Sequence, residues 1–138
     1  MFNKLVVSTM MVLSTAFANL TVREARDNAC QVFGGDDFTH FNLTALDKNG
    51  TGIYAKDAIE WRFCDHLPSS TYFSHLVDLR RGVIPLSTDS YEVDEVKVLN
   101  NSLGIPSGVA LTRYSDEVCK TNGTTNTYYT FSTVITCD

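Results

Sequence analysis

The first 18 residues constrain this chain most, because they decide in which compartment it folds. Lys4 provides a positive charge, Leu5 to Leu13 form a short apolar stretch, and Ala16-Phe17-Ala18 provides the small residues that signal peptidase recognises. The apolar stretch is shorter than the roughly 20 residues that a membrane-spanning helix requires. A buried N-terminal helix is the alternative. We expect residues 1–18 to be a signal peptide, and the mature chain to lie in the lumen of the endoplasmic reticulum, Golgi or lysosome, or outside the cell.

The remaining residues, 19–138, are predicted to form one domain. No second apolar stretch follows the leader, so we expect no membrane anchor in this chain. The net charge is −5 and the pI is about 5.0. Because the chain has no basic stripe, nucleic acid is not an expected partner. Hydrophobic residues make up 43% of the sequence, which argues against disorder.

All four cysteines lie after the predicted leader, at Cys30, Cys64, Cys119 and Cys137. An even number of cysteines in an oxidising compartment predicts disulfides, and four cysteines allow three pairings. Zinc is the competing interpretation. It would require closely spaced Cys or His pairs, which this sequence lacks, so we expect no metal and no other cofactor.

Five acceptor sequences for N-glycosylation support a secretory destination. They begin at Asn19, Asn42, Asn49, Asn100 and Asn122, and each has Ser or Thr two residues later without an intervening proline. A glycan is bulky and hydrophilic, so every occupied asparagine must lie on the surface.

The hydrophobic pattern predicts an all-β fold, either a sandwich or a barrel. Ile59, Trp61 and Phe63 alternate with polar residues, as in a strand with one buried face. Similar strands are expected around 95–98, 108–114 and 127–137, and Asn122-Gly123 predicts a hairpin turn between the last two. We expect short helical segments only at 22–27 and just before Asp47. The alternation also predicts that Trp61 is a core residue rather than a platform for a sugar.

One segment resembles the start of an EF-hand loop, Asp47-Lys-Asn49-Gly-Thr51-Gly52. The twelfth position of such a loop should be a bidentate Glu, and here it is Ala58. A strand also follows where a helix should begin. We therefore expect a glycosylated turn instead of a calcium site.

The sequence contains no catalytic motif, and we expect no enzyme activity. His40, His66 and His75 do not have the spacing of metal ligands. The carboxylate pairs Asp36-Asp37 and Asp116-Glu117 are expected to lie in solvent at turns, because adjacent strand residues point to opposite faces.

Taken in order, several segments resemble the mannose 6-phosphate receptor homology (MRH) domain, the fold of the P-type lectins. Cys30, then Phe41-Asn-Leu-Thr-Ala-Leu46, then Tyr54 and the strand ending at Cys64 are similar to the opening of that family. Gly108-Val-Ala-Leu-Thr-Arg-Tyr114, Cys119 and the Thr-rich strand into Cys137-Asp138 are similar to its central hairpin. The resemblance implies a flattened antiparallel β-barrel or sandwich with a Cys30–Cys64 disulfide.

The resemblance does not extend to the sugar-binding residues. The family binds sugar with Gln, Arg, Glu and Tyr, but the matching segments here read Gly82-Val-Ile-Pro-Leu-Ser87 and Thr127-Tyr-Tyr-Thr130, without Gln or Arg. The family's Glu, Tyr and last two cysteines fall beyond Asp138. We therefore assign no sugar-binding residue and expect no binding of mannose 6-phosphate. Cys119 and Cys137, whose usual partners are those last cysteines, are expected either to pair with each other or to be free.

Two functions follow from the resemblance. The first is a lectin-like module for glycoprotein recognition or sorting in the secretory and endolysosomal pathway, with N-glycans or glycoproteins as partners. The alternative is a structural or interaction protein that has the same fold and does not bind carbohydrate.

Overall fold

The computed structural model describes residues 21–35, 39–47 and 52–137. The predicted leader, Asn19, Asn49 and the Asp36-Asp37 pair lie outside these residues. The elements are α2 (Val22–Ala29), β1 (Gln31–Gly34), β2 (Thr39–Asn42), the 3-10 turn η2 (Thr44–Leu46), β3 (Tyr54–Lys56), β4 (Ile59–Trp61), β5 (Ser74–Asp78), β6 (Gly82–Pro85), β7 (Glu95–Asn100), β8 (Pro106–Asn122) and β9 (Thr125–Thr136). This confirms the prediction of a mostly β protein, and the two helical segments lie where they were expected.

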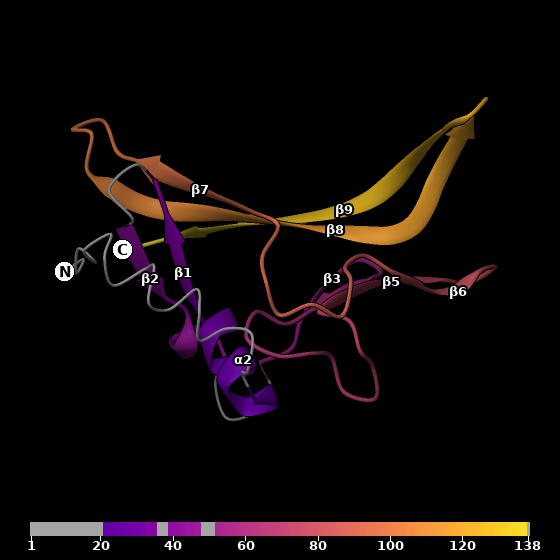
Figure 1. Cartoon of the computed structure of the whole chain (residues 1–138), viewed down its shortest axis with the longest axis horizontal. Helices are drawn as coiled ribbons and strands as arrows, with labels where there is room; N and C mark the ends of the chain where they lie inside the picture. Colours follow the sequence, from indigo (N-terminus) through magenta and orange to yellow (C-terminus); the bar gives the residue numbers. More distant parts are fainter. Residues whose placement is uncertain (1–20, 36–38, 48–51, 138) are drawn as a thin grey trace.

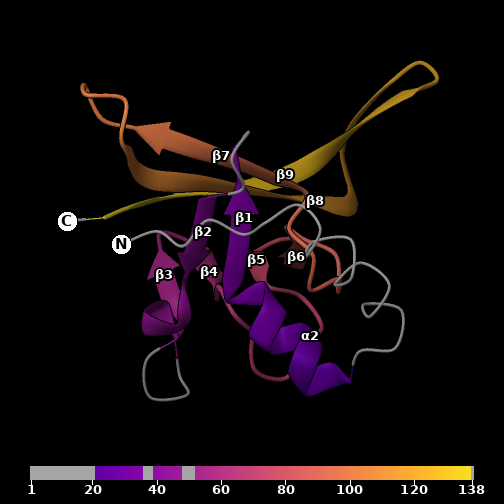
Figure 2. The same cartoon turned by 60° about the vertical axis from the view of Figure 1, so that its left-hand side comes forward.

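The strands form three antiparallel sheets, ordered β1-β2, β3-β4-β5-β6 and β7-β8-β9. Figures 1 and 2 show the β7-β8-β9 sheet as one layer, with α2 and the two smaller sheets on one side of it. A closed barrel requires every strand to pair on both sides. In the described part of the chain, β7 and β9 each pair on one side only, so the sheet is open and no closed barrel forms.

Helix α2 is short, and its first turn is fixed by its own side chains. Thr21 accepts a hydrogen bond from the backbone N–H of Glu24 (3.2 Å), and the Glu24 carboxylate accepts one from the N–H of Thr21 (2.7 Å). This reciprocal capping box satisfies two amides that the helix itself leaves unpaired. Among the described residues, no helix is long and apolar enough to span a membrane.

A disulfide between Cys30 and Cys64 ties the end of α2 to the segment after β4, with the two Cα atoms 4.6 Å apart. Both cysteines belong to the main buried cluster, which also contains Val32, Phe41, Leu43, Val109 and Leu111. These residues come from β1, β2 and β8 and the segment following β2. The disulfide therefore crosses the region where the layers meet.

Strand β1 packs closely on β7 because it ends in a residue without a side chain. A Cβ atom on Gly34 would lie 2.8 Å from Cγ1 of Val96 and 3.0 Å from Cγ2 of Val98, too close for unstrained packing. This approach brings β1 and the chain before β7 next to each other, and a cavity lies between them.

Candidate functional site

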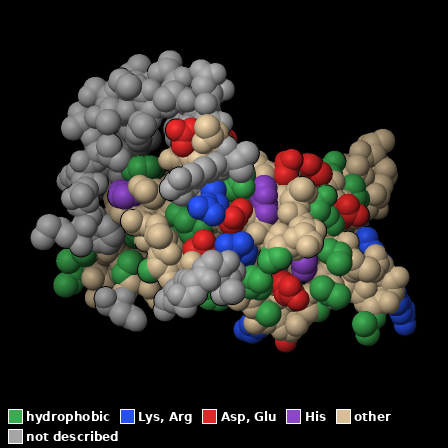
Figure 3. Space-filling model, turned by 90° about the horizontal axis from the view of Figure 1, so that it is seen from below, with side chains coloured by type: hydrophobic (Ala, Val, Ile, Leu, Met, Phe, Trp, Pro, Cys, Tyr) green, Lys and Arg blue, Asp and Glu red, His purple; other side chains and the backbone are tan. Residues whose placement is uncertain are grey.

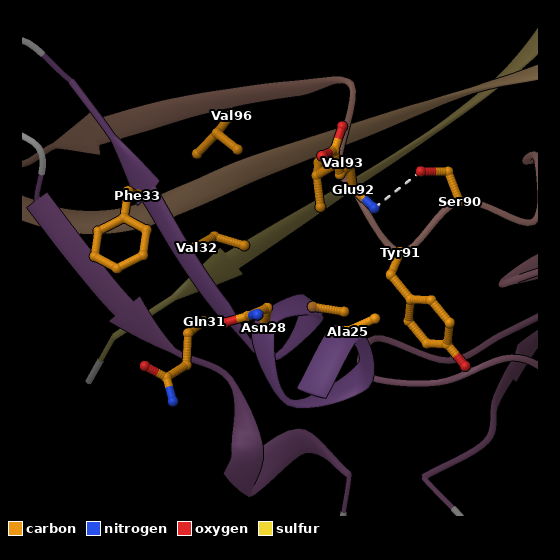
Figure 4. Close-up of a pocket in the computed structure, with 11 residues that line it drawn as sticks. Ala25, Asn28, Gln31, Val32, Phe33, Ser90, Tyr91, Glu92, Val93 and Val96 are labelled. Carbon is orange, nitrogen blue, oxygen red and sulfur yellow. Dashed lines mark hydrogen bonds between the residues drawn. The ribbon is translucent and has the colours of Figure 1, made fainter. Parts of the chain in front are cut away.

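A cavity of about 640 Å³ lies between α2, β1 and the segment that enters β7. We call it the α2 cavity. It is lined by Ala25, Asn28, Ala29, Gln31, Val32, Phe33, Ser90, Tyr91, Glu92, Val93 and Val96 (Figure 4). Its volume is within the range of small-molecule sites, which combine an apolar lining with a few converging polar groups.

One wall of the α2 cavity consists of the last turn of α2 and the start of β1. Ala29 and Val32 are buried there and are only 3% and 5% exposed. Asn28 and Gln31 contribute side-chain amides to the lining of this wall, and in Figure 4 the Gln31 amide points away from Ser90 and Tyr91. Oε1 of Gln31 lies 3.0 Å from Nε2 of His40, which orients the Gln31 amide. Each amide supplies both donors and an acceptor.

The opposite wall, residues 90–93, has no regular secondary structure and is held in place by Arg113. The β8 residues Leu111, Arg113 and Ser115 alternate onto a buried face, so the Arg113 guanidinium must find partners inside the protein. Its Nη1 donates to the carbonyls of Ser90 (2.9 Å) and Glu92 (3.0 Å). Burial lowers the pKa of Arg113 to about 10. The cation also lies 3.7 Å above the ring of Phe73.

Asp65 connects the two walls of the α2 cavity. The hydroxyl of Tyr91 donates to Oδ1 of Asp65 (3.3 Å), while Oδ2 lies 3.6 Å from Nη1 of Arg26 on α2. Burial, and then the negative charge of Asp65, raise the pKa of Tyr91. Asp65 also follows Cys64 directly and is therefore anchored to α2 through the disulfide. These ties hold the shape of the cavity without a ligand.

The chemistry of this lining suits an uncharged ligand that carries hydroxyl groups. Asn28, Gln31, Ser90, Tyr91 and Glu92 supply amide, hydroxyl and carboxylate groups around an aliphatic floor. The described lining contains a carboxylate and no Lys or Arg, so an anionic ligand would be repelled. No group of three or more His, Cys, Asp or Glu residues in the described part of the chain is arranged to hold a metal.

Two other recesses offer fewer polar groups of this kind. One of about 730 Å³, beside the loop at 68–72, has neither a carboxylate nor an amide side chain in its lining. The other, about 410 Å³, lies between the β3–β4 turn and β9 and is lined partly by Lys56, Asp57, Trp61 and Phe131. On the face seen in Figure 3, basic and acidic side chains are intermixed.

Trp61 is not a fully buried core residue, which corrects the expectation from the alternating pattern. Its side chain is half-buried and lies between Tyr54 (ring centroids 5.8 Å apart) and Phe131 (5.5 Å). The strand β4 ends at Trp61 itself, so this face of the short hairpin meets β9 at the rim of the core. The indole Nε1 is shielded from solvent and has no hydrogen-bond partner among the described residues.

Cys119 and Cys137 are both free and exposed. The backbone N–H of Cys137 donates to the carbonyl of Ser107, at the start of β8, whereas Cys119 lies near the far end of that strand. About 12 residues of strand separate these points, roughly 30–40 Å at the usual rise per residue. A disulfide needs Cα atoms within about 7 Å, so the two cysteines do not pair across the hairpin.

The predicted glycosylation sites within the described residues, Asn42, Asn100 and Asn122, are all exposed. Oδ1 of Asn42 accepts from the backbone N–H (3.0 Å) and the hydroxyl (2.6 Å) of Thr44, which is the third residue of its own sequon. Occupation of these sites stays a prediction.

The remaining candidate residues are dispersed. His40 contacts Gln31, the Nε2 of His66 lies 2.8 Å from the Asp89 carbonyl, and the Nε2 of His75 lies 3.5 Å from Glu60. Asp116 and Glu117 are exposed, in β8 rather than at a turn.

Asp47, the first residue of the EF-hand-like segment, accepts a hydrogen bond from Nη2 of Arg62 at 2.7 Å. Its carboxylate is therefore already paired within the protein.

Sequence patterns did not reveal the lining of the α2 cavity. Asn28 and Gln31 are separated from Ser90, Tyr91 and Glu92 by about 60 residues, and neither segment carries a motif. The position of Gln31 directly after Cys30, a disulfide cysteine, is a signal that could have pointed to this wall. Comparisons with protein-family models, with curated proteins and with solved structures found no match to this chain.

Proposed function

We propose that this chain is a lectin-like recognition module of the secretory pathway, with the finer fold of the P-type lectins, and that it binds neutral glycans of glycoproteins in the α2 cavity. The observation that carries the proposal is the lining of the α2 cavity, to which one segment contributes Asn28 and Gln31 and a distant segment contributes Ser90, Tyr91 and Glu92, beside aliphatic side chains. A sugar ring presents apolar C–H groups and several hydroxyls, which match such a lining. The order of cysteines and aromatic strands in the sequence supports the same reading.

The preference for neutral sugars follows from charge. Glu92 can accept hydrogen bonds from sugar hydroxyls, and a charge-assisted bond contributes roughly 1.5–3 kcal/mol. The same carboxylate opposes phosphorylated or sialylated sugars. Neutral N-glycans are therefore the proposed ligands, and mannose 6-phosphate is not.

A glycan array with the secreted protein, followed by NMR titration of the best ligand, tests this function. Glu92→Gln retains the size of the side chain and should weaken binding by about 10- to 100-fold. Glu117→Gln removes the same charge from an exposed position on β8 and serves as the matched control. Asn28→Ala should also weaken binding. Absence of binding to any neutral glycan, or equal affinity of the Glu92 and Glu117 variants, would contradict the proposal.

An interaction protein without carbohydrate binding is the second candidate. It is favoured by a different feature, the long uncharged edge of β9.

A further inference from the structure

Strand β9 leaves one whole edge unpaired within the described part of the chain. In the order β7-β8-β9 it pairs with β8, and no described strand lies on its other side. Its sequence, TNTYYTFSTVIT, contains no charged residue, no proline and no glycine. A long uncharged edge of residues that favour strands is a template for pairing with another strand.

The other edge strands in the described residues are protected. Strand β7 contains Glu95 and Lys97, β3 has three residues including Lys56, and β6 has four residues and ends at Pro85. Strands β1 and β2 have only four residues each. Short length, charge and proline are the features by which natural sheets prevent pairing at their edges, and β9 has none of them.

Irregular pairing does not interrupt β9 either. Between the pairs Tyr114↔Thr130 and Val118↔Tyr128, three residues of β8 face one residue of β9. The extra residues of the bulge are therefore all in β8, and β9 continues without a break.

The first half of β9 extends beyond the end of β7, and it meets the other sheet only through Tyr129, whose hydroxyl accepts from Nη1 of Arg81 (3.0 Å), and Phe131, which packs on Trp61, among the contacts of the described residues. Strand β7 pairs with β8 only as far as Thr112, and beyond that point the β8–β9 hairpin continues as the projecting arm visible in Figures 1 and 2. Within this arm, Tyr128 is 47% exposed and Thr130 is exposed. Tyr129 and Phe131 share the face of β9 that meets the other sheet, whereas Tyr128 and Thr130 lie on the opposite, exposed face, so these contacts do not occupy the edge of the strand.

We infer that two copies of this chain associate by antiparallel pairing of residues 125–131 of β9, with Tyr128 near the two-fold axis. The pairing joins the two sheets through their arms, so that at the contact four strands lie side by side in the order β8-β9-β9-β8. About half of the residues in an edge strand point their N–H and C=O groups outward, so the pairing satisfies these groups in both copies. The body of each protein then lies at the opposite end of the paired arms.

A second copy fits this edge better than an unrelated strand for two reasons. Identical strands face each other without repulsion, because the segment has no charge, and cross-strand Thr and Tyr pairs are favourable. A contact across a two-fold axis also uses the same edge of both copies, so it ends with the dimer and does not build a longer assembly. Because β7 ends opposite Thr112, the outer edges beside the paired segment are residues 113–122 of the two β8 strands, where Asp116, Glu117 and Lys120 oppose further growth.

Sedimentation-velocity measurements on the secreted, glycosylated chain, from micromolar to near-millimolar concentration, test this inference. The wild type is expected to show a reversible monomer–dimer equilibrium. Tyr128→Lys places two like charges across the axis and should raise the dimer dissociation constant at least about tenfold. Tyr128→Thr shortens the side chain at the same position without adding charge, and it should still dimerise. Circular dichroism and thermal melting verify that both variants are folded.

Hydrogen exchange gives a second readout of the same contact. Amides in residues 125–131 should become more protected as the concentration rises, whereas those of β7 should not. A monomer at every concentration, or a Tyr128→Lys variant that dimerises as tightly as Tyr128→Thr, would overturn the inference. If the amides of residues 125–131 are protected equally at every concentration, another segment or another partner covers the β9 edge, and the inference is wrong. Glycan binding in the α2 cavity is measured separately and should survive in the Tyr128→Lys monomer.

Discussion

The hydroxyl of Tyr91 donates a hydrogen bond to Oδ1 of Asp65, 3.3 Å away, and Oδ2 of the same carboxylate lies 3.6 Å from Nη1 of Arg26. Tyr91 belongs to one wall of the α2 cavity and Arg26 to the helix that forms the other. Asp65 is itself adjacent to a disulfide cysteine. A single carboxylate therefore fixes the distance between segments that are far apart in the sequence.

The Tyr91–Asp65 contact should make stability fall at high pH. Burial and Asp65 raise the pKa of Tyr91 above 10 in the folded protein. The neutral phenol is therefore favoured by folding, and its contribution is complete below pH 10 and is lost as the pH rises through the folded pKa. Urea unfolding at several pH values on both sides of 10 should show a steeper decline for the wild type than for Tyr91→Phe. The exposed Tyr128→Phe variant is the control, and equal slopes for wild type and Tyr91→Phe would refute the prediction.

Arg113→Lys should loosen the wall at 90–93. Lysine retains the charge but lacks the planar guanidinium group. In Arg113, Nη1 of this group donates to the carbonyls of both Ser90 and Glu92. We expect a loss of about 1–3 kcal/mol in the free energy of unfolding, together with weaker glycan binding. Arg81→Lys, at an exposed site that contacts Tyr129, should cost less than about 0.5 kcal/mol. Chemical denaturation measures both, and equal costs would show that Arg113 is not a specific brace.

Removal of the Cys30–Cys64 disulfide should be strongly destabilising. The two cysteines are 34 residues apart in the sequence, and release of such a loop lowers stability by roughly 3–4 kcal/mol through the entropy of the unfolded chain. The double variant Cys30→Ala/Cys64→Ala should unfold at lower urea concentration than the wild type. The double variant Cys119→Ala/Cys137→Ala removes two free, exposed thiols and should change stability little. A similar effect of both double variants would contradict the expected role.

Trp61→Ala should cost less than truncation of a fully buried aromatic residue. Trp61 is half-buried between Tyr54 and Phe131, and we expect its loss to cost less than the roughly 3–5 kcal/mol typical of a buried aromatic residue. Phe73 is 1% exposed, and Phe73→Ala should cost roughly 3–5 kcal/mol. Chemical unfolding, monitored by circular dichroism, compares the free energies of unfolding of the two variants. A Trp61→Ala cost equal to that of Phe73→Ala would restore the original interpretation of Trp61 as a core residue.

The local features of the fold could be predicted from the sequence because they depend on neighbouring residues. The alternation around 95–98 and 108–114 and the β-branched composition of the last strand predicted three strands, which the structure contains as β7, β8 and β9. Asn122-Gly123 predicted the hairpin turn, where Gly123 adopts φ +63°. The pairing of Cys30 with Cys64 followed from the resemblance rather than from spacing, since four cysteines allow three pairings.

The tertiary structure alone decided how these elements assemble. Whether a sheet closes depends on the pairing of its edges, and among the described strands none pairs with the outer edge of β9, so the sheet is open there. Trp61 lies at the rim of the core because β4 stops there and β9 passes beside it, which no alternation of residues within one strand can reveal. The α2 cavity likewise required Gln31 and Glu92 to meet across about 60 residues. Local preferences act over a few residues, whereas long-range packing depends on which buried faces and unpaired edges fit one another.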